Sequence, residues 1–271
     1  MGLIFDINAA RLYESWCRSP QGKAMERSAE KLILTLVAPQ PGERVLDIGC
    51  GTGNHLLFFS KLGLDINGID ASLYMINRAR ERLGSCALLK HARAEALPFD
   101  DNEFDLAVFI NTLEFLDDPL QALAEAGRVA NRKVFIGVMN SFSWNCLCVK
   151  LQDFFQKSLF HHVKFYNLWE LKSHVQMAYG PVPVAWRCAQ VLPSLIEKIE
   201  GLKTTGRWNL MYWPFGSFLG LSVTILYHVK TDNLPLKIKM TKARQSVTSG
   251  ISMKNLNRVE GVQGEERGLS L

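Results

Sequence analysis

The sequence predicts an α/β protein built on an open, mostly parallel β-sheet, and two observations lead to this prediction. The apolar run at residues 43–48 has the character of a buried parallel strand. Three glycines follow at alternate positions (Gly49, Gly51 and Gly53), and residues 54–62 then have the pattern of a helix. A strand, a glycine turn and a helix form the first half of a nucleotide-binding βαβ unit. Strand-like and helical segments also continue to alternate beyond it.

The glycine-rich turn carries a recognisable motif. From Asp47 to Gly53 the sequence is D-I-G-C-G-T-G, with the spacing G-x-G-x-G. Glycine lets the backbone turn sharply and lets a ligand touch it, because no Cβ stands in the way. The stretch closely resembles motif I of the class I S-adenosylmethionine-dependent methyltransferases, in which the loop and its acid cup the cofactor. The resemblance implies a Rossmann-like, doubly wound sheet of seven strands, mostly parallel, with helices on both faces and a reversed C-terminal hairpin.

A second predicted strand, residues 64–70, ends in an acid. Asp70 lies seventeen residues past Gly53, near the distance at which a Rossmann-type site places its ribose-binding carboxylate. One ionised carboxylate can accept both donors of a ribose diol, so we expect Asp70 to bind the ribose. Met75 follows and resembles the apolar residue that packs on the adenine in this family. A helical methionine that simply fills the core is the alternative.

The next signature is at residues 94–105, which run A-E-A-L-P-F-D-D-N-E-F-D. It resembles a segment of small-molecule methyltransferases of the quinone-biosynthesis type (methyltransferase type 11), whose loop after the third strand contacts the adenine. The resemblance therefore implies cofactor contacts at Ala94 and Glu95. Arg93 replaces the Asp that usually binds the adenine amino group, which leaves a backbone contact from Ala94 as the expected one.

A further strand, residues 104–110, leads into two polar candidates at the carboxyl edge of the sheet, where ligands of open α/β sheets bind. We expect Asn111 beside the cofactor. Glu114 has two interpretations: a general base, or a solvated acid in the first turn of a helix, which is the favoured one. A helix at 116–130 and a strand at 133–139 are expected next.

The N-terminal residues 1–39 are expected to form a helical cap with two helices, ahead of a methyltransferase domain at 40–230. In methyltransferases with the resembled core, such a segment often folds over the cofactor. Tyr13 and Trp16 would then close the pocket, although the same rings could simply pack the helix on the domain.

Aromatic residues accumulate beyond residue 140. The segments 140–166 and 190–215 are longer than ordinary connections, and such segments are usually functional lids or binding loops. We expect both aromatic-rich insertions to border the space next to the transferred methyl group, with Trp144 facing it. Ordinary packing is the alternative for these rings. The remaining elements expected are a helix at 168–178 and strands at 182–188 and 218–229.

Charge is unevenly placed along the chain. The formal net charge is +5, and residues 230–271 hold eight Lys or Arg against four acids, a balance of +4 that leaves about +1 for the body. The body therefore carries no charge argument for nucleic acid. Residues 231–271 are expected to be a basic, disordered tail, solvated in preference to bound to a membrane or a nucleic acid.

Other features bound the compartment and the cofactors. Cys146 and Cys148 form a C-x-C, but no second pair at zinc-like spacing accompanies them, so no metal site is expected. The first residues lack a basic region and a long apolar region, so they do not resemble a signal peptide. The apolar run at 215–229 is short for a membrane span. We therefore expect a cytoplasmic protein with no transmembrane segment.

The function implied by the resemblance is methyl transfer from S-adenosylmethionine to a small, partly apolar acceptor by in-line displacement. An oxygen or carbon nucleophile would need a base. The candidates are Glu114, His55, His161 and His162, and the sequence ranks none of them above the others. A protein that binds S-adenosylmethionine without turnover, as a sensor or partner subunit, is the alternative. Dinucleotide binding is disfavoured because the glycine spacing is not G-x-G-x-x-G. The acceptor and the oligomeric state are left open.

Overall fold

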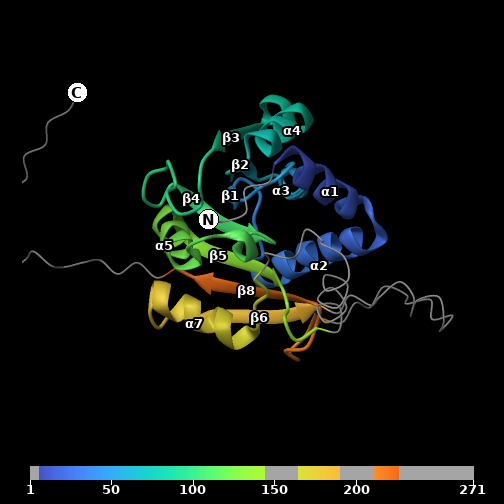
Figure 1. Cartoon of the computed structure of the whole chain (residues 1–271). Helices are drawn as coiled ribbons and strands as arrows, with labels where there is room; N and C mark the ends of the chain where they lie inside the picture. Colours follow the sequence, from blue (N-terminus) through green and yellow to red (C-terminus); the bar gives the residue numbers. More distant parts are fainter. Residues whose placement is uncertain (1–5, 144–163, 190–209, 226–271) are drawn as a thin grey trace, which may run out of the picture. The chain divides into compact units, whose positions relative to one another are not determined.

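A twisted sheet with helices on both faces organises the residues that this computed structural model describes, which are 6–143, 164–189 and 210–225 (Figure 1). All of them belong to one unit, Met1–His228. Within the described residues the sheet has eight strands in the order β3-β2-β1-β4-β5-β8-β6-β7. The strands are β1 (Arg44–Ile48), β2 (Asp65–Asp70), β3 (Ala87–His91), β4 (Phe104–Ile110), β5 (Ala130–Met139), β6 (Val184–Ala189), β7 (Leu210–Met211) and β8 (Phe218–Thr224).

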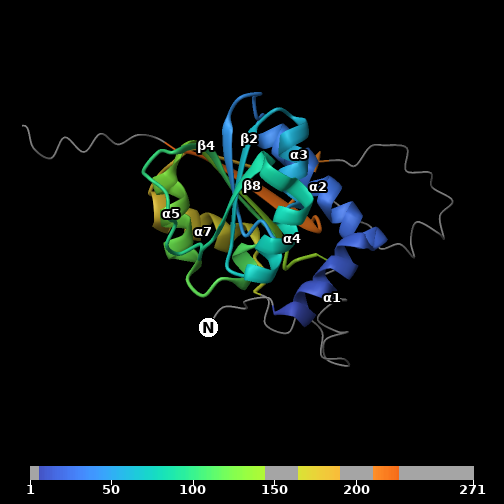
Figure 2. The ribbon, with the colours of Figure 1, turned by 90° about the horizontal axis from the view of Figure 1, so that it is seen from above.

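The helices cover the two faces of this sheet (Figure 2). One face packs against α2, α3 and α4, and the other packs against α5 and α7. The helical elements are α1 (Ile7–Arg18), α2 (Pro20–Leu36), α3 (Asn54–Lys61), α4 (Leu73–Leu83), α5 (Pro119–Val129), α7 (Leu168–Tyr179) and the short 3-10 turns η1 (Gly84–Cys86) and η2 (Leu113–Phe115).

The sheet topology confirms the predicted fold class. Strands β1 to β5 pair in parallel, whereas β8 runs antiparallel to both β5 and β6 as the reversed C-terminal hairpin. The two-residue strand β7 at the edge is an addition to the expected seven strands. The strand order reverses between β1 and β4, and a reversal of this kind marks where ligands bind in doubly wound sheets.

Several element boundaries differ from those expected. Helix α5 begins at Pro119, later than predicted, because Asp118 caps it by accepting from the Gln121 backbone N–H at 3.0 Å. Strand β5 begins directly after this helix at Ala130, so the strand is longer than predicted. Most of both aromatic-rich insertions lies outside the described residues, and so do Trp144, His161, His162 and the tail at 231–271.

Helix α2 is part of the hydrophobic core. It buries one face, including Ala29, Leu32 and Ile33, against the sheet. Gly220 on β8 allows this approach, because a Cβ there would stand 3.1 Å from Leu32 Cβ. No helix among the described residues combines the length and the apolar character that crossing a bilayer requires.

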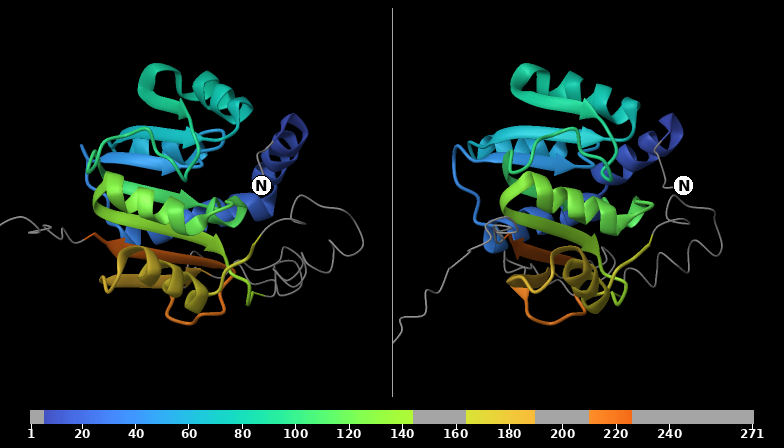
Figure 3. Two further views of the ribbon diagram at one scale, coloured as in Figure 1. Left: turned by 60° about the vertical axis from the view of Figure 1, so that its left-hand side comes forward. Right: turned by 90° about the vertical axis from the view of Figure 1, so that its left-hand side faces the viewer.

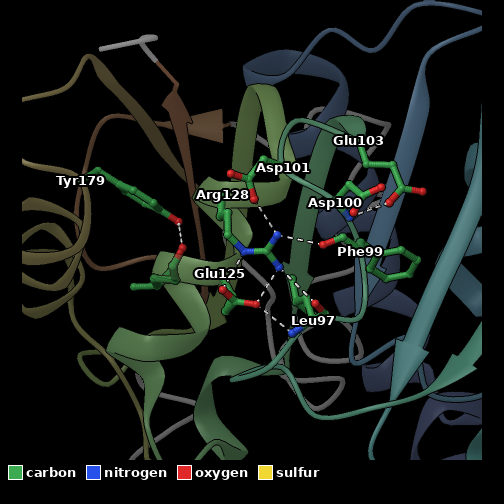
Figure 4. A network of polar contacts seen from close by, with 9 residues as sticks. Leu97, Phe99, Asp100, Asp101, Glu103, Glu125, Arg128 and Tyr179 are labelled. Carbon is green, nitrogen blue, oxygen red and sulfur yellow. Dashed lines mark hydrogen bonds and ion pairs between the residues drawn. The ribbon is translucent and has the colours of Figure 1, made fainter. Parts of the chain in front are cut away.

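A single arginine ties the loop after β3 to α5 (Figure 4). The Arg128 guanidinium donates to both carboxylate oxygens of Glu125 at 2.8 Å and to Asp101 at 2.8 Å. It also donates to the carbonyl oxygens of Phe99 at 2.8 Å and Leu97 at 3.0 Å. All five guanidinium N–H donors are thereby used, and the loop that continues from Ala94 is fixed to the body of the domain.

Candidate active site

A cavity of about 1110 Å³, a figure that includes the part open to solvent, lies at the carboxyl ends of β1, β2 and β4. Helix α1 lies beyond the same ends of the strands (Figure 3). The cavity is lined by the glycine loop, the residues after β2, β3 and β4, and the facing sides of α1 and α2. It therefore occupies the position where the strand order reverses, as expected for a ligand site of this fold.

The glycine loop forms the floor of the cavity, and its three glycines have different roles. All three adopt the left-handed conformation, with φ of +79°, +52° and +80° at Gly49, Gly51 and Gly53. A Cβ at Gly49 would clash with Thr112, and one at Gly53 would stand 2.8 Å from Leu83. A Cβ at Gly51 would meet nothing within 4 Å among the described residues, and Gly51 lines the cavity. Gly49 and Gly53 are thus needed for packing, whereas Gly51 leaves room for a ligand.

The role of Thr112 was missed by sequence reasoning. It fills the space beside Gly49, and its Oγ1 donates to the Ile110 carbonyl at 3.3 Å. The signal for it was Gly49 itself, since a glycine can mark a close approach of another residue.

Asp70, the residue expected to bind the ribose, lies half-buried at the end of β2 and lines the cavity. Its Oδ2 accepts from the Gly51 backbone N–H at 2.9 Å, and its Oδ1 accepts from the Ser72 N–H at 2.8 Å. Burial raises the pKa of the carboxyl, and these two N–H groups oppose the rise. Asp70 therefore also holds the glycine loop against β2, a structural role that the sequence did not indicate.

Two buried oxygen atoms near the floor have no hydrogen-bond partner within the described part of the chain. They are Asp47 Oδ2, at the end of β1, and Asn111 Oδ1, just after β4. Burial, together with the nearby charge of Asp70, raises the pKa of Asp47 to about 8. Asn111 has a φ of +53°, and its backbone N–H donates to the Gly137 carbonyl at 2.9 Å. Such unpaired acceptors are suited to a ligand that brings its own N–H donors.

The residues predicted to contact adenine also line the cavity. Met75, buried on α4, lines the cavity together with Ala94 and Glu95. The Arg93 guanidinium lies 3.2 Å from Glu95 and 3.1 Å from Asp117. Arg93 therefore pairs with neighbouring carboxylates across the cavity rim, and Ala94 remains available for a backbone contact.

Helix α1 supplies the wall that faces the glycine loop. Tyr13 and Trp16 both line the cavity, with ring centroids 5.9 Å apart and planes inclined by 30°. Burial is the main cause of a raised pKa at Tyr13. Arg78 on α4 lies 3.4 Å from Glu14 and so connects α1 to the rest of the domain.

Glu114 is not the solvated helix acid that the sequence favoured; that interpretation is wrong. Glu114 lies in η2 and is only 2% exposed. Its Oε1 accepts from the Met139 backbone N–H at 2.8 Å. Its Oε2 has no hydrogen-bond partner among the residues described. Burial raises the pKa of this carboxyl to about 7. The helix expected from 116 begins only at 119, so Glu114 belongs to a tight turn at the sheet edge.

The pKa of His55 is lowered by burial, whereas that of Glu114 is raised. His55 follows the glycine loop as the second residue of α3 and lines the cavity. Its Nε2 is buried without a partner in the described ranges, and burial lowers the pKa of the ring to about 4. The imidazole is therefore neutral near pH 7.

Comparison with known proteins shows which family the core of this chain resembles. Residues 46–136 match the family model described as a methyltransferase domain. A demethylmenaquinone methyltransferase from Renibacterium salmoninarum is 36% identical over 103 residues, which are 38% of this chain and 43% of that protein. A malonyl-[acyl-carrier protein] O-methyltransferase from Salmonella typhimurium is 32% identical over 109 residues, 40% of this chain and 43% of that protein. The chain thus spans less than half the length of these two curated relatives.

Solved structures share the fold. A methyltransferase from Thermotoga maritima, described as a possible histamine N-methyltransferase, aligns with a TM-score of 0.62 at 23% identity, over 80% of this chain and 95% of that one. Magnesium protoporphyrin IX methyltransferase from Synechocystis, solved with bound S-adenosylhomocysteine, aligns with a TM-score of 0.54 at 12% identity, over 83% and 90% of the two chains. At these identities the likeness shows the common architecture.

Proposed function

We propose that this chain, whose residues 46–136 belong to the methyltransferase domain family, transfers a methyl group from S-adenosylmethionine to a small, partly apolar acceptor. The observation that carries the proposal is the geometry at Gly51. Its missing side chain leaves the cavity floor open, and its N–H is held by the carboxylate expected to bind the ribose.

The residues of the cavity fit this cofactor. Both Asp70 oxygens keep lone pairs after accepting backbone N–H groups, and these can accept from the ribose hydroxyls. Asn111 Oδ1, from a residue that lines the cavity, and Asp47 Oδ2, buried two residues before Gly49, would accept from the ammonium group of the methionine moiety. Met75 and the Ala94 backbone border the space for the adenine.

The chemistry asks the protein mainly for alignment. When bound, the cofactor supplies a methyl group already activated on a sulfonium, so positioning the nucleophile in line with it can provide much of the acceleration. Where the acceptor must lose a proton, two of the four candidates lie among the described residues: His55 lines the cavity, whereas Glu114, with a pKa of about 7, is 2% exposed and is not one of the cavity-lining residues. His55, with a pKa of about 4, would be a weaker base.

The small-acceptor proposal is supported by three observations. The body of the chain is nearly neutral, which does not suit an enzyme that acts on nucleic acid. The cavity walls combine the apolar surfaces of Tyr13, Trp16 and Met25 with a few polar groups, as small-molecule sites do. Two curated relatives carry names of enzymes that methylate a quinone precursor and a carrier-bound acyl group.

The test has two stages. Calorimetric titration with S-adenosylmethionine and NAD, side by side, should show binding of the first alone. Transfer of a labelled methyl group to a panel of apolar phenols, quinols and carboxylic acids should then give product with the parent and none with Gly51→Val. Binding without turnover on any member of this panel or on bulk RNA and protein would favour a sensor or a partner subunit. Labelling of RNA or protein alone would contradict the small acceptor.

A further inference from the structure

A connected group of exposed aromatic rings lies at the end of the sheet next to the reversed hairpin. The group, called the aromatic edge here, has side chains that are 48–70% exposed, namely Phe142, Trp169, Tyr212, Trp213 and Phe215. They come from three segments: the residues after β5, the first turn of α7 and the turn before β8.

Four of the five rings of the aromatic edge touch one another, whereas Tyr212 contacts the Trp186 ring. Phe142 lies 6.0 Å from Trp169 and 6.2 Å from Phe215, measured between ring centroids, and Phe215 lies 6.1 Å from Trp213. Single exposed apolar residues are normal on a protein surface, but a contiguous aromatic patch marks an interaction site.

Cations accompany these rings. The Arg187 guanidinium lies over the Tyr212 ring, and Lys172 Nζ is 5.4 Å from the centroid of the Trp186 ring next to it. Lys164, which is exposed, begins the segment that leads into α7. Within the described residues 140–143, 164–174, 184–189 and 210–217 there are three cations against one acid, Glu170, so the balance is +2. The Glu170 carboxylate accepts from the Asn167 N–H at 3.1 Å, as part of the helix cap.

The aromatic edge and the cavity lie at the same edge of the sheet. Strands β5 and β6 both run antiparallel to β8 and therefore point the same way, as do β1, β2 and β4. The rings follow the carboxyl ends of β5 and precede β8, whereas the cavity follows the carboxyl ends of β1, β2 and β4. A surface that covered the aromatic edge would also face the side of the sheet on which the cavity opens.

We propose that the aromatic edge, with Lys164, Lys172 and Arg187 around it, docks the protein on an anionic lipid surface. Trp and Tyr are enriched at membrane–water interfaces, where their rings lie at the level of the headgroups. Lys and Arg beside them meet the negative potential of anionic lipids. Protein–protein interfaces are also enriched in aromatic residues and Arg but are depleted in Lys, so it is the two lysines at this edge that favour a lipid surface. The inference does not depend on the proposed methyl transfer, although it would place the cavity where acceptors dissolved in a lipid phase can reach it.

The test is sedimentation of the full chain with vesicles of phosphatidylcholine, alone or mixed with phosphatidylglycerol. We expect binding to the mixed vesicles and a loss of about tenfold or more in affinity for the double variant Trp169→Ser/Trp213→Ser, since binding scales with the apolar area inserted. Lys172→Gln/Arg187→Gln should weaken binding to the mixed vesicles. The matched control is Leu88→Ser on the edge strand β3, at the opposite side of the sheet. Leu88 is 49% exposed, and its replacement should leave vesicle binding unchanged.

The basic tail does not confound this comparison, because every variant keeps it. If the double tryptophan variant binds as tightly as the parent, or if the parent does not bind the mixed vesicles, the proposal is overturned. A concentration-dependent dimer that the double variant abolishes would instead assign the aromatic edge to a second copy of the chain. Calorimetry with S-adenosylmethionine separates the two proposals, since the double variant should bind the cofactor normally whatever the vesicles show.

Discussion

The cavity floor and the Arg128 network are two polar clusters of the same domain, and they differ in how completely their hydrogen bonds are satisfied. Around Arg128 all five guanidinium donors have acceptors, and two of these acceptors are loop carbonyls. In the second cluster Asn111, which lines the cavity, and Asp47, which is buried two residues before Gly49, each keep a buried oxygen that no described residue pairs with. The first cluster is complete within the chain, whereas the second is suited to a ligand. In these two clusters, the complete one is structural and the incomplete one is suited to binding.

The same contrast appears in the carboxyl pKa values. Hydrogen bonds from Arg128 are the main cause that lowers the pKa of Glu125, so this acid is stabilised in its charged form. Burial raises the pKa of Asp47 to about 8 and that of Glu114 to about 7, so these acids are destabilised when charged. The two clusters should accordingly respond to pH with opposite signs.

The largest expected effect is the loss of cofactor binding in Gly51→Val. A branched side chain would fill the open space on the cavity floor, and we expect affinity for S-adenosylmethionine to fall more than about 100-fold, or at least 2.7 kcal/mol. Gly84→Val is the matched control. The φ of Gly84 is +58°, close to the +52° of Gly51, and a Cβ there would also meet no atom within 4 Å among the described residues. Gly84 is not one of the residues that line the cavity. Both variants should lose similar stability from backbone strain, but calorimetry should show binding only for Gly84→Val. Normal binding by Gly51→Val would mean that the cofactor lies elsewhere.

The second effect is on stability and concerns the other cluster. Arg128→Met leaves the Leu97 and Phe99 carbonyls and the Glu125 carboxylate without their donor, and we expect a loss of about 2–4 kcal/mol in the free energy of unfolding. Urea titration measures it. Arg128→Lys, which keeps the charge but not the planar fork, should fall between the parent and Arg128→Met. A stability unchanged in Arg128→Met would show that water replaces these contacts.

Asp70→Ala should have an intermediate effect on binding. Removing the carboxylate eliminates the expected ribose acceptor and frees the Gly51 N–H, and we expect cofactor binding to weaken by about 1.5–3 kcal/mol, or roughly ten- to a hundredfold. Asp65→Ala, at the first residue of the same strand and exposed, is the control and should bind normally. Equal affinities for the two variants in calorimetry would exclude Asp70 as the ribose ligand.

The smallest expected effect is the pH dependence of the cofactor-free protein. The Glu114 pKa rises from 4.5 to about 7 on folding, so the folded state holds the proton longer and stability is lost as pH rises through this window. Asp47, whose pKa rises from 3.8 to about 8, likewise loses stability as pH rises through that range. Glu125, whose pKa is lowered, contributes stability above its unfolded pKa, and this stability is lost as pH falls. Glu114→Gln should therefore lose less stability than the parent between about pH 5 and pH 8, by about 1–2 kcal/mol. The measurement is the melting temperature as a function of pH. If it changes with pH by the same amount in Glu114→Gln and the parent, Glu114 is not buried in its neutral form.

The residues whose position at the cavity could be expected from the sequence are those whose place follows from one βα unit. Asp70 ends a strand at a characteristic distance from the glycine loop, and Gly51 lies in a motif of fixed spacing, so both could be placed without a structure. The fold class followed from the resemblance of that same unit, although the two-residue strand β7 has no pattern long enough to detect.

Contacts between distant segments could not be predicted. Glu114 was expected to be a solvated acid in the first turn of a helix, and only the hydrogen bond from the Met139 N–H of β5 shows it to be buried and bonded. Arg128 carries no motif, and its importance arises from a loop about 30 residues away in the chain. The packing of Thr112 on Gly49 spans 63 residues in the same way.

The packing of Leu32 against Gly220 has a consequence for folding during translation. Helix α2 is made early, yet the β8 strand that covers its apolar face follows about 190 residues later. At translation rates of about 5–20 residues per second, that face waits on the order of 10–40 s for its partner. During this interval the apolar face of α2, with Ala29, Leu32 and Ile33, lacks the strand that completes its cover, and a chaperone that shields apolar surface would act there until synthesis reaches the reversed hairpin.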